Sequence, residues 1–302
     1  MTFGNQHSFF RTKITYAVLV LIILVLYRPQ AALSQQTIQI RHSQGDGDIA
    51  HSYFSQIISE VLHRTEKEYG SSELKVSVEN LTQKRSLHFV EIGKEIDLDW
   101  AGTNKERERT LRAIRIPLNL GLLGYRLLVI KKGRRTEFDQ ITTPQQLKKL
   151  IACQGQHWPD SDILEDNGYT VDRTIRFEFM WTMIDKKRCD YFPRAISEGY
   201  GETEHFGTNK FLAYDKLLLA YRFPMYFFVN KKDEQLALRF EKGLETMLND
   251  GSLLQLMKEH PATRSAFPLT QYQNSRIFFM QNNFLTPETL NLPNKYWLSL
   301  EN

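Results

Sequence analysis

Short apolar runs alternate with helical patterns along most of the chain. Residues 37–41 alternate like a β-strand. The apolar residues that fall on one face of the helix that follows are Tyr53, Phe54, Ile57, Ile58, Val61 and Leu62. Gly70 predicts the end of that helix. A strand at 74–78, a helix at 82–96 and a strand at 97–102 complete a βαβαβ unit, which favours a mainly parallel sheet with helices on its faces.

A second series of the same kind begins near Tyr125. It predicts a helix that starts at Pro144, with Thr143 as its N-cap, and strands at 126–131, 151–154, 175–179 and 189–192. A buried strand at 225–230 and helices over 236–248 and 253–259 follow. Two such series predict an α/β protein with two sheets.

The first 34 residues carry an export pattern. Arg11 and Lys13 precede an apolar run over 14–27, and small residues follow at 32–34. The run is short for a membrane-spanning helix, so we expect a signal peptide at 1–34 and a periplasmic body that begins near Gln35. An uncleaved membrane anchor is the alternative.

The charge of the chain is nearly balanced once this segment is set aside. Of its 39 Lys and Arg residues, three lie in the first 34, which leaves 36 against 35 Asp and Glu. This balance removes the electrostatic basis for a nucleic-acid partner. Only Cys153 and Cys189 are available for a disulfide, and two separate buried thiols are equally compatible with the sequence.

Five segments occur in an order that resembles the periplasmic solute-binding proteins of the amino-acid type (bacterial extracellular solute-binding protein family 3), in an uncharacterised branch. The segments are DLDWAGTNKERERTLRAIRIPL, GYRLLVIKKG, TTPQQLKKLIACQGQHW, KKRCDYFPRAISE and MYFFVNKKDEQLALRFEKGLETMLNDGSLLQLMKEH. The resemblance implies the type II periplasmic binding fold, with one lobe at 35–120 plus 225–302 and a second at 121–224. Two hinge crossings would join the lobes, with the ligand between them. It also implies that the strands of Cys153 and Cys189 are neighbours, which would allow a disulfide.

The resemblance places part of the ligand site after the strand DLDWAG. Thr103 and Arg107 are similar to the family's hydroxyl and guanidinium that hold a ligand carboxylate, and Trp100 would wall the same cleft. An arginine fork matches the two oxygens of a carboxylate. The alternative for Arg107 is a solvated, mixed-charge helix face.

The second lobe would supply Gly155, His157 and Arg194. Gly155 permits close approach of the backbone, and His157 would line the cleft unless it is a surface residue. No second His or Cys stands nearby at ligand spacing, so we expect no metal. Arg194 stands where amino-acid binders place an acid for the ligand's ammonium group. We therefore expect an anionic ligand, unless Arg194 faces solvent or pairs with Glu198.

These features together favour a monomeric, non-catalytic periplasmic binding protein. It would close on a small polar, anionic molecule for ABC-type uptake and serve an inner-membrane permease. The alternative is a sensing or interaction module of the same fold that serves a membrane receptor. An enzyme is less favoured, because no paired carboxylates or nucleophile–base set can be placed in the cleft, and we expect no cofactor.

Overall fold

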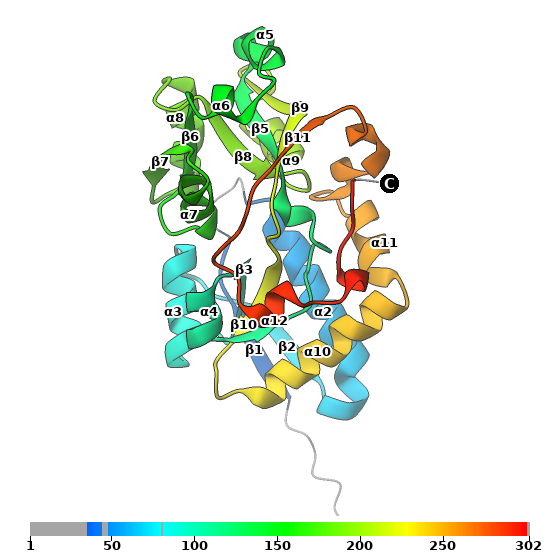
Figure 1. The fold of residues 1–302 in the computed structure, drawn as a ribbon. Helices are drawn as coiled ribbons and strands as arrows, with labels where there is room; N and C mark the ends of the chain where they lie inside the picture. The colour runs from blue at the N-terminus through cyan, green and yellow to red at the C-terminus, as the bar shows by residue number, and fades with distance from the viewer. Residues whose placement is uncertain (1–34, 44–47, 80, 301–302) are drawn as a thin grey trace, which may run out of the picture. The chain divides into compact units, whose positions relative to one another are not determined.

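Two β-sheets organise the chain in the computed structural model, which describes residues 35–302 except 44–47, 80 and 301–302 (Figure 1). The predicted signal peptide lies outside the described residues. The predicted α/β fold with two sheets flanked by helices is confirmed.

The first sheet has the strand order β2-β1-β3-β10-β4. Its strands are β1 (Gln36–Ile40), β2 (Ser72–Val76), β3 (Leu98–Gly102), β4 (Arg112–Ile114) and β10 (Met225–Val229). Strands β1, β2 and β3 pair in parallel, whereas β10 runs antiparallel to β3 and β4. The helices that follow these strands are α2 (Ala50–Tyr69), α3 (Gln83–Ile92), α4 (Lys105–Thr110), α10 (Glu234–Asn249) and α11 (Ser252–Glu259). Helices α2 and α10 pack closely at Gly243. The absence of a side chain there leaves room for Val61 of α2.

The second sheet has the order β11-β9-β5-β8-β6-β7. Its strands are β5 (Tyr125–Lys131), β6 (Ile151–Gly155), β7 (Thr170–Thr174), β8 (Tyr191–Ala195), β9 (Phe211–Ala220) and β11 (Arg276–Phe279). The helices of this part are α5 (Arg135–Asp139), α6 (Pro144–Leu147), α7 (Pro159–Asp166), α8 (Phe177–Asp185) and α9 (Gly199–Phe206). Strand β5 pairs antiparallel with β8 and β9, so this sheet also mixes both pairing directions.

One predicted strand is a helix in the structure. Residues 175–179 were expected to form a strand, but β7 ends at Thr174 and α8 begins at Phe177. The helix buries Phe177, Trp181 and Ile184, which recur at helical spacing. The alternation of apolar and charged residues at 175–179 resembles a strand, but Ile175 and Phe179 are exposed and only Phe177 is buried.

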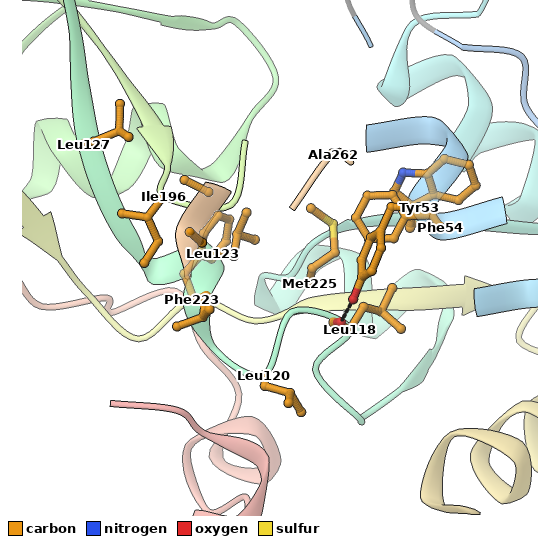
Figure 2. Packing of buried hydrophobic residues seen from close by; sticks show 14 of the residues in the cluster. Tyr53, Phe54, Leu118, Leu120, Leu123, Leu127, Ile196, Phe223, Met225 and Ala262 are labelled. Atoms are coloured by element: carbon orange, nitrogen blue, oxygen red, sulfur yellow. Dashed lines mark hydrogen bonds between the residues drawn. The ribbon is translucent and has the colours of Figure 1, made fainter. Parts of the chain in front are cut away.

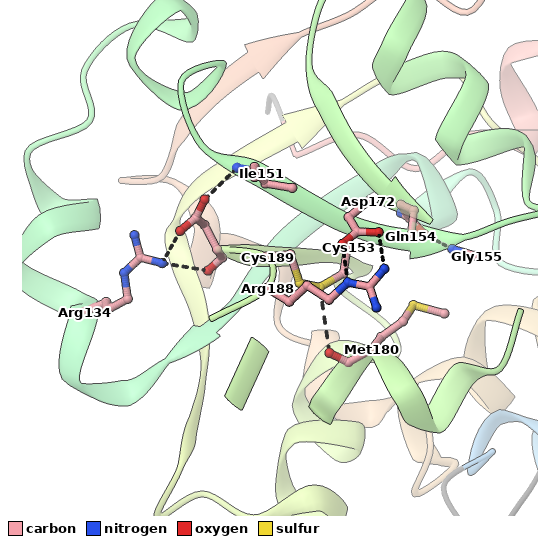
Figure 3. Close-up of a disulfide and its surroundings, with 10 residues drawn as sticks. Arg134, Ile151, Cys153, Gln154, Gly155, Asp172, Met180, Arg188 and Cys189 are labelled. Carbon is pink, nitrogen blue, oxygen red and sulfur yellow. Dashed lines mark hydrogen bonds and ion pairs between the residues drawn. A yellow bond between two sulfur atoms is a disulfide. The ribbon is translucent and has the colours of Figure 1, made fainter. Parts of the chain in front are cut away.

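The two cysteines form a disulfide in the second sheet (Figure 3). Cys153 lies in β6, and Cys189 lies in the turn before β8, its parallel neighbour. Their Cα atoms are 5.5 Å apart, inside the range of about 7 Å that a disulfide allows.

The apolar core continues through the segment that connects the two sheets. Figure 2 shows Tyr53 and Phe54 of α2 beside Leu118 of this segment, with the Tyr53 hydroxyl donating to the Leu118 carbonyl at 2.8 Å. Both tyrosine and leucine are fully buried. The connection is therefore packed as core and not as an exposed linker.

The C-terminal tail contacts elements of both sheets. Its strand β11 pairs with β9 of the second sheet, although residues 225–302 were assigned as a whole to the first lobe. The tail then runs to the first sheet, where it forms α12 (Pro287–Leu290) (Figure 1), and continues past it to the connecting segment, where Leu298 N donates to the Leu120 carbonyl. On the way, Asn283 donates to Asp166 of α7 at 2.8 Å, and its carbonyl accepts from Lys105 of α4 at 2.8 Å.

The buried carboxylate of Glu108 holds the tail at α12. The hydroxyls of Thr286 and Thr289 donate to Glu108 of α4 at 3.0 and 2.8 Å. Thr103 donates to the same carboxylate at 2.8 Å, and Arg115 does so at 2.9 Å. Four donors thus compensate the burial of one negative charge.

Removal of this carboxylate should destabilise the protein. We expect Glu108→Ala to lower the free energy of unfolding by about 2 to 4 kcal/mol, because the buried hydroxyls of Thr103 and Thr289 and the half-buried hydroxyl of Thr286 lose their acceptor. Chemical denaturation measures the loss. Glu106→Ala, an exposed position in the same helix, is the control and should change stability by less than about 0.5 kcal/mol. Equal effects of the two changes would contradict this role of Glu108.

Loss of the disulfide should also lower stability. The bond joins residues 36 apart in sequence, so it restricts the unfolded chain considerably. We expect the double change Cys153→Ala and Cys189→Ala to cost about 2 to 4 kcal/mol in chemical denaturation. An unchanged midpoint under oxidising conditions would contradict this expectation.

Candidate functional site

A cavity of about 80 Å³ lies between elements of the two sheets, several times the roughly 10–15 Å³ that one water molecule needs. The lining residues from the part of the chain that builds the first sheet include Arg41, Asp48, Phe54, Gln83, Trp100 and Gly102. Those from the second include Arg126, Trp158, Asp160, Phe177, Arg194, Glu198 and Glu202. Charged and aromatic side chains therefore dominate its wall.

Arg41 follows β1 and is held by two carboxylates. Its Nε donates to Asp99 at 2.8 Å, and its Nη1 donates to Asp48 at 3.2 Å. The guanidinium carbon stands 4.2 Å above the ring of Trp100, within range of a cation–π interaction. These contacts hold Arg41 flat against one wall of the cavity.

Arg126 begins the buried strand β5 and pairs with Asp160 in the first turn of α7. The two groups lie 2.5 Å apart, and Arg126 Nε also donates to the Tyr221 hydroxyl at 3.0 Å. That hydroxyl in turn donates to Asp160 at 2.5 Å. The three side chains form a closed hydrogen-bonded ring that places the Asp160 carboxylate at the cavity.

Arg194 lies in β8 and contacts two glutamates. Glu198 is the N-cap of α9, and Glu202 lies within that helix. Arg194 makes a bidentate pair with Glu202, with both N–O distances at 2.6 Å. Its Nη2 lies 2.8 Å from Glu198 Oε2. Burial raises the pKa of Glu202 to about 7, although the charge of Arg194 opposes the shift. Near neutral pH this carboxyl is therefore poised between its charged and neutral forms.

Two glycines let aromatic rings approach the cavity wall. A side chain at Gly155 would collide with Trp158, whose ring packs 2.5 Å from the position of the missing Cβ. A side chain at Gly102 would meet Phe223 in the same way, at 2.2 Å. These positions accept only glycine because the rings fill the space of a side chain.

Negative charge exceeds positive charge in this cavity. Its lining residues include four carboxylates and three guanidiniums. They are Asp48, Asp160, Glu198 and Glu202 against Arg41, Arg126 and Arg194. Asp99, which pairs with Arg41 from behind, makes a fifth carboxylate. Each lining arginine already has at least one carboxylate partner.

Two of the predicted site residues line the cavity, and one predicted arginine does not. Trp100 and Arg194 both belong to its wall and are 1% and 8% exposed. Arg107 lines an adjacent groove instead. Its guanidinium donates to the carbonyls of Gly102 and His157 at 2.5 and 3.1 Å and to Gln83 at 2.9 Å. Burial lowers the pKa of Arg107 to about 10.

The remaining predicted residues lie near the cavity without lining it. Thr103 is buried and directed at Glu108. Gly155 supports Trp158 from behind, as described above. His157 is exposed beside Arg107 in the adjacent groove, and nearby positive charge and burial lower its pKa. Roles in ligand binding for these three stay predictions.

Several cavity residues escaped prediction because they are distant in sequence. Arg41, Arg126 and Asp160 lie in or after three different elements and meet only in the fold. One signal was present: Arg126 opens the apolar strand RLLVI, where a charge demands a buried partner. Glu202, four residues after Glu198, carried no comparable signal.

The described residues hold neither a membrane-spanning helix nor a cluster of metal ligands. No helix within them is long and apolar enough to cross a membrane. They also contain no group of three or more His, Cys, Asp or Glu side chains that could hold a metal ion.

Solved structures share the fold, although no family model matches the sequence and no curated protein does so. A periplasmic binding protein of Salmonella typhimurium with high arginine specificity has a TM-score of 0.56 at 12% identity, over 74% of this chain and 99% of that chain. An ancestral arginine-binding protein bound to arginine has a TM-score of 0.53 at 14% identity, over 75% and 99%. A histidine kinase sensor domain with similarity to periplasmic binding proteins has a TM-score of 0.55 at 11% identity, over 78% and 99%. The chain thus has the two-lobed fold of periplasmic binding proteins.

The pKa of Glu202 predicts a pH dependence of stability. A carboxyl whose pKa rises from 4.5 to about 7 on folding binds its proton more tightly in the native state. Its contribution is fully present below pH 4.5 and is lost as the pH rises through about 7. Glu202→Gln removes this titration, so the unfolding free energy of the parent should fall relative to the variant, by up to about 3 kcal/mol.

Denaturation at a series of pH values from 4.5 to 8 measures this difference. Glu204→Gln, an exposed position in the same helix, is the control and should follow the parent at every pH. A constant difference between the parent and Glu202→Gln would show that Glu202 does not titrate in this range.

Proposed function

We propose that this protein is a periplasmic solute-binding protein that encloses a small polar ligand between its two sheets for ABC-type uptake. The cavity carries this proposal, because charged side chains from elements of both sheets meet there. Clefts between domains of α/β proteins are common ligand sites. The fold shared with arginine-binding periplasmic proteins supports the same role.

The charges of the cavity argue against the anion expected from the sequence. That expectation needed Arg107 and Arg194 to face the ligand with unpaired positive charge. Arg194 is instead held by Glu198 and Glu202, and Arg107, which does not line the cavity, donates to the neutral carbonyl oxygens of Gly102 and His157. An added anion would increase an existing excess of negative charge.

The lining of the cavity gives little support to catalysis. The lining residues from the described part of the chain include no serine, cysteine or histidine. Its carboxylates are held by arginines in ion pairs, which leaves no pair of carboxyl groups free for acid and base roles. The solved structures named above are binding or sensor proteins, which agrees with a non-catalytic role.

A sensory role is the second candidate. The likeness to a histidine kinase sensor domain covers 78% of this chain, slightly more than the likeness to the Salmonella protein. In that role the same closed, liganded form would contact a membrane receptor in place of a permease. Cross-linking in native membranes, followed by mass spectrometry of the captured partner, distinguishes a permease from a receptor.

A thermal-shift screen tests the binding function. The purified protein is mixed with amino acids, amines, dicarboxylates, sugar acids and sugars at millimolar concentration. A ligand at a hundred times its Kd adds about 2.7 kcal/mol to stability, which should raise the melting temperature by about 5 to 10 °C. The absence of any shift, together with no small molecule that copurifies in native mass spectrometry, would contradict the proposed function.

A further inference from the structure

We infer that the ligand of this cavity is a small organic cation, an amine or a guanidinium compound that binds without a carboxylate, and that Glu198 receives its positive group. This inference rests on the proposed function and narrows the class of ligand. It follows from the charge balance of the cavity, from the position of the Glu198 carboxylate in its wall and from the carboxylate partners that the arginines already have.

The charge balance calls for a positive ligand. Four lining carboxylates face three arginines, and the count is five against four when Asp99 and Arg107 behind the wall are included. A buried excess of negative charge is costly unless a cation compensates it. A cationic ligand therefore gains a favourable interaction that an anion or a neutral molecule does not.

Glu198 offers the acceptor. It begins α9, is 6% exposed and lines the cavity. Its Oε2 is buried and accepts no hydrogen bond of acceptable geometry from any described residue, although Arg194 Nη2 lies 2.8 Å away and Arg126 Nη1 lies 3.9 Å away. An ammonium or guanidinium donor in the cavity would pair with this carboxylate beside Arg194.

A ligand carboxylate finds no available arginine in the same cavity. Arg41 and Arg194 each contact two carboxylates, and Arg126 is fixed by Asp160 and Tyr221. A further carboxylate beside any of them would meet the negative charge that already surrounds the guanidinium. Arg107, which the sequence predicted for this role, does not line the cavity and donates to the carbonyl and amide oxygens of Gly102, Gln83 and His157.

The aromatic walls agree with a cation. Phe54, Trp100, Trp158, Phe177 and Phe223 line the cavity. Aromatic faces attract ammonium and guanidinium groups and exclude water around them. The methylene chain of an alkylamine would contact the same rings.

Matched pairs of compounds test the inference, because each pair differs only in a carboxylate. Isothermal titration calorimetry of the full protein compares agmatine with arginine, putrescine with ornithine, and cadaverine with lysine. We expect at least one amine to bind at least about thirtyfold more tightly than its amino acid, since an unpaired buried carboxylate is strongly disfavoured.

Variants of α9 test the role of Glu198. Glu198→Gln keeps the shape of the side chain and removes its charge, so the affinity for the amine should fall at least about tenfold. Glu204→Gln, exposed on the same helix, should bind the amine like the parent. Melting temperatures of both unliganded variants show whether each is folded, and the compound pairs on the parent protein test the inference even if Glu198→Gln is not.

The outcomes separate the inference from the proposed function. Amino acids that bind as tightly as their amines would overturn the inference, and so would a ligand of another class found in the thermal-shift screen. Either result leaves the binding function standing. Amine binding that Glu198→Gln leaves unchanged would overturn the assignment of Glu198. Failure of every compound in the screen would contradict both.

Discussion

The neutralisation of buried guanidinium groups is the constraint on which this structure depends. Arg41, Arg126 and Arg194 are at most 8% exposed, and a buried cation without a partner would be unstable. Each is therefore surrounded by carboxylates, and these come from loops and helices that follow different strands. These ion pairs fix the positions of the charged side chains that line the cavity.

Such internal pairing has a consequence for how the cavity recognises a ligand. An arginine already held by carboxylates is rigid and well oriented, but its positive charge is cancelled locally. The wall can therefore be rich in arginine and still favour a positive group. Arg194 illustrates this, since its bidentate partner Glu202 and its neighbour Glu198 together outweigh it. A count of arginines in a sequence does not reveal the sign of a site.

Periodicity and family resemblance predicted the α/β fold, most of its elements and the pairing of the two cysteines. They failed at 175–179, where apolar residues alternate with Arg176 and Glu178 as they would in a strand, whereas the structure buries Phe177 and exposes Ile175 and Phe179. Trp100 and Arg194 were placed near the ligand because the resemblance aligned the segments that contain them with segments of the ligand site. Asp48, Asp160 and Glu202 were not, because side chains brought together by long-range packing leave no local pattern. The position of Arg107 depends on how one short helix, α4, directs its side chains, which spacing does not fix.

The attachment of the C-terminal tail bears on the order in which the protein can fold. Glu108 obtains two of its four donors from residues 286 and 289, and strand β10 enters the first sheet from residues 225–229. A nascent chain that has emerged only as far as β9 therefore lacks strand β10, which lies inside the first sheet. The Glu108 carboxylate then also lacks two of its four hydrogen-bond donors. Contacts between residues so far apart in sequence slow folding. The first sheet, although it contains the earliest strands, can be completed only after residues 225–229 have been synthesised, and Glu108 obtains its last donors only with residues 286–289.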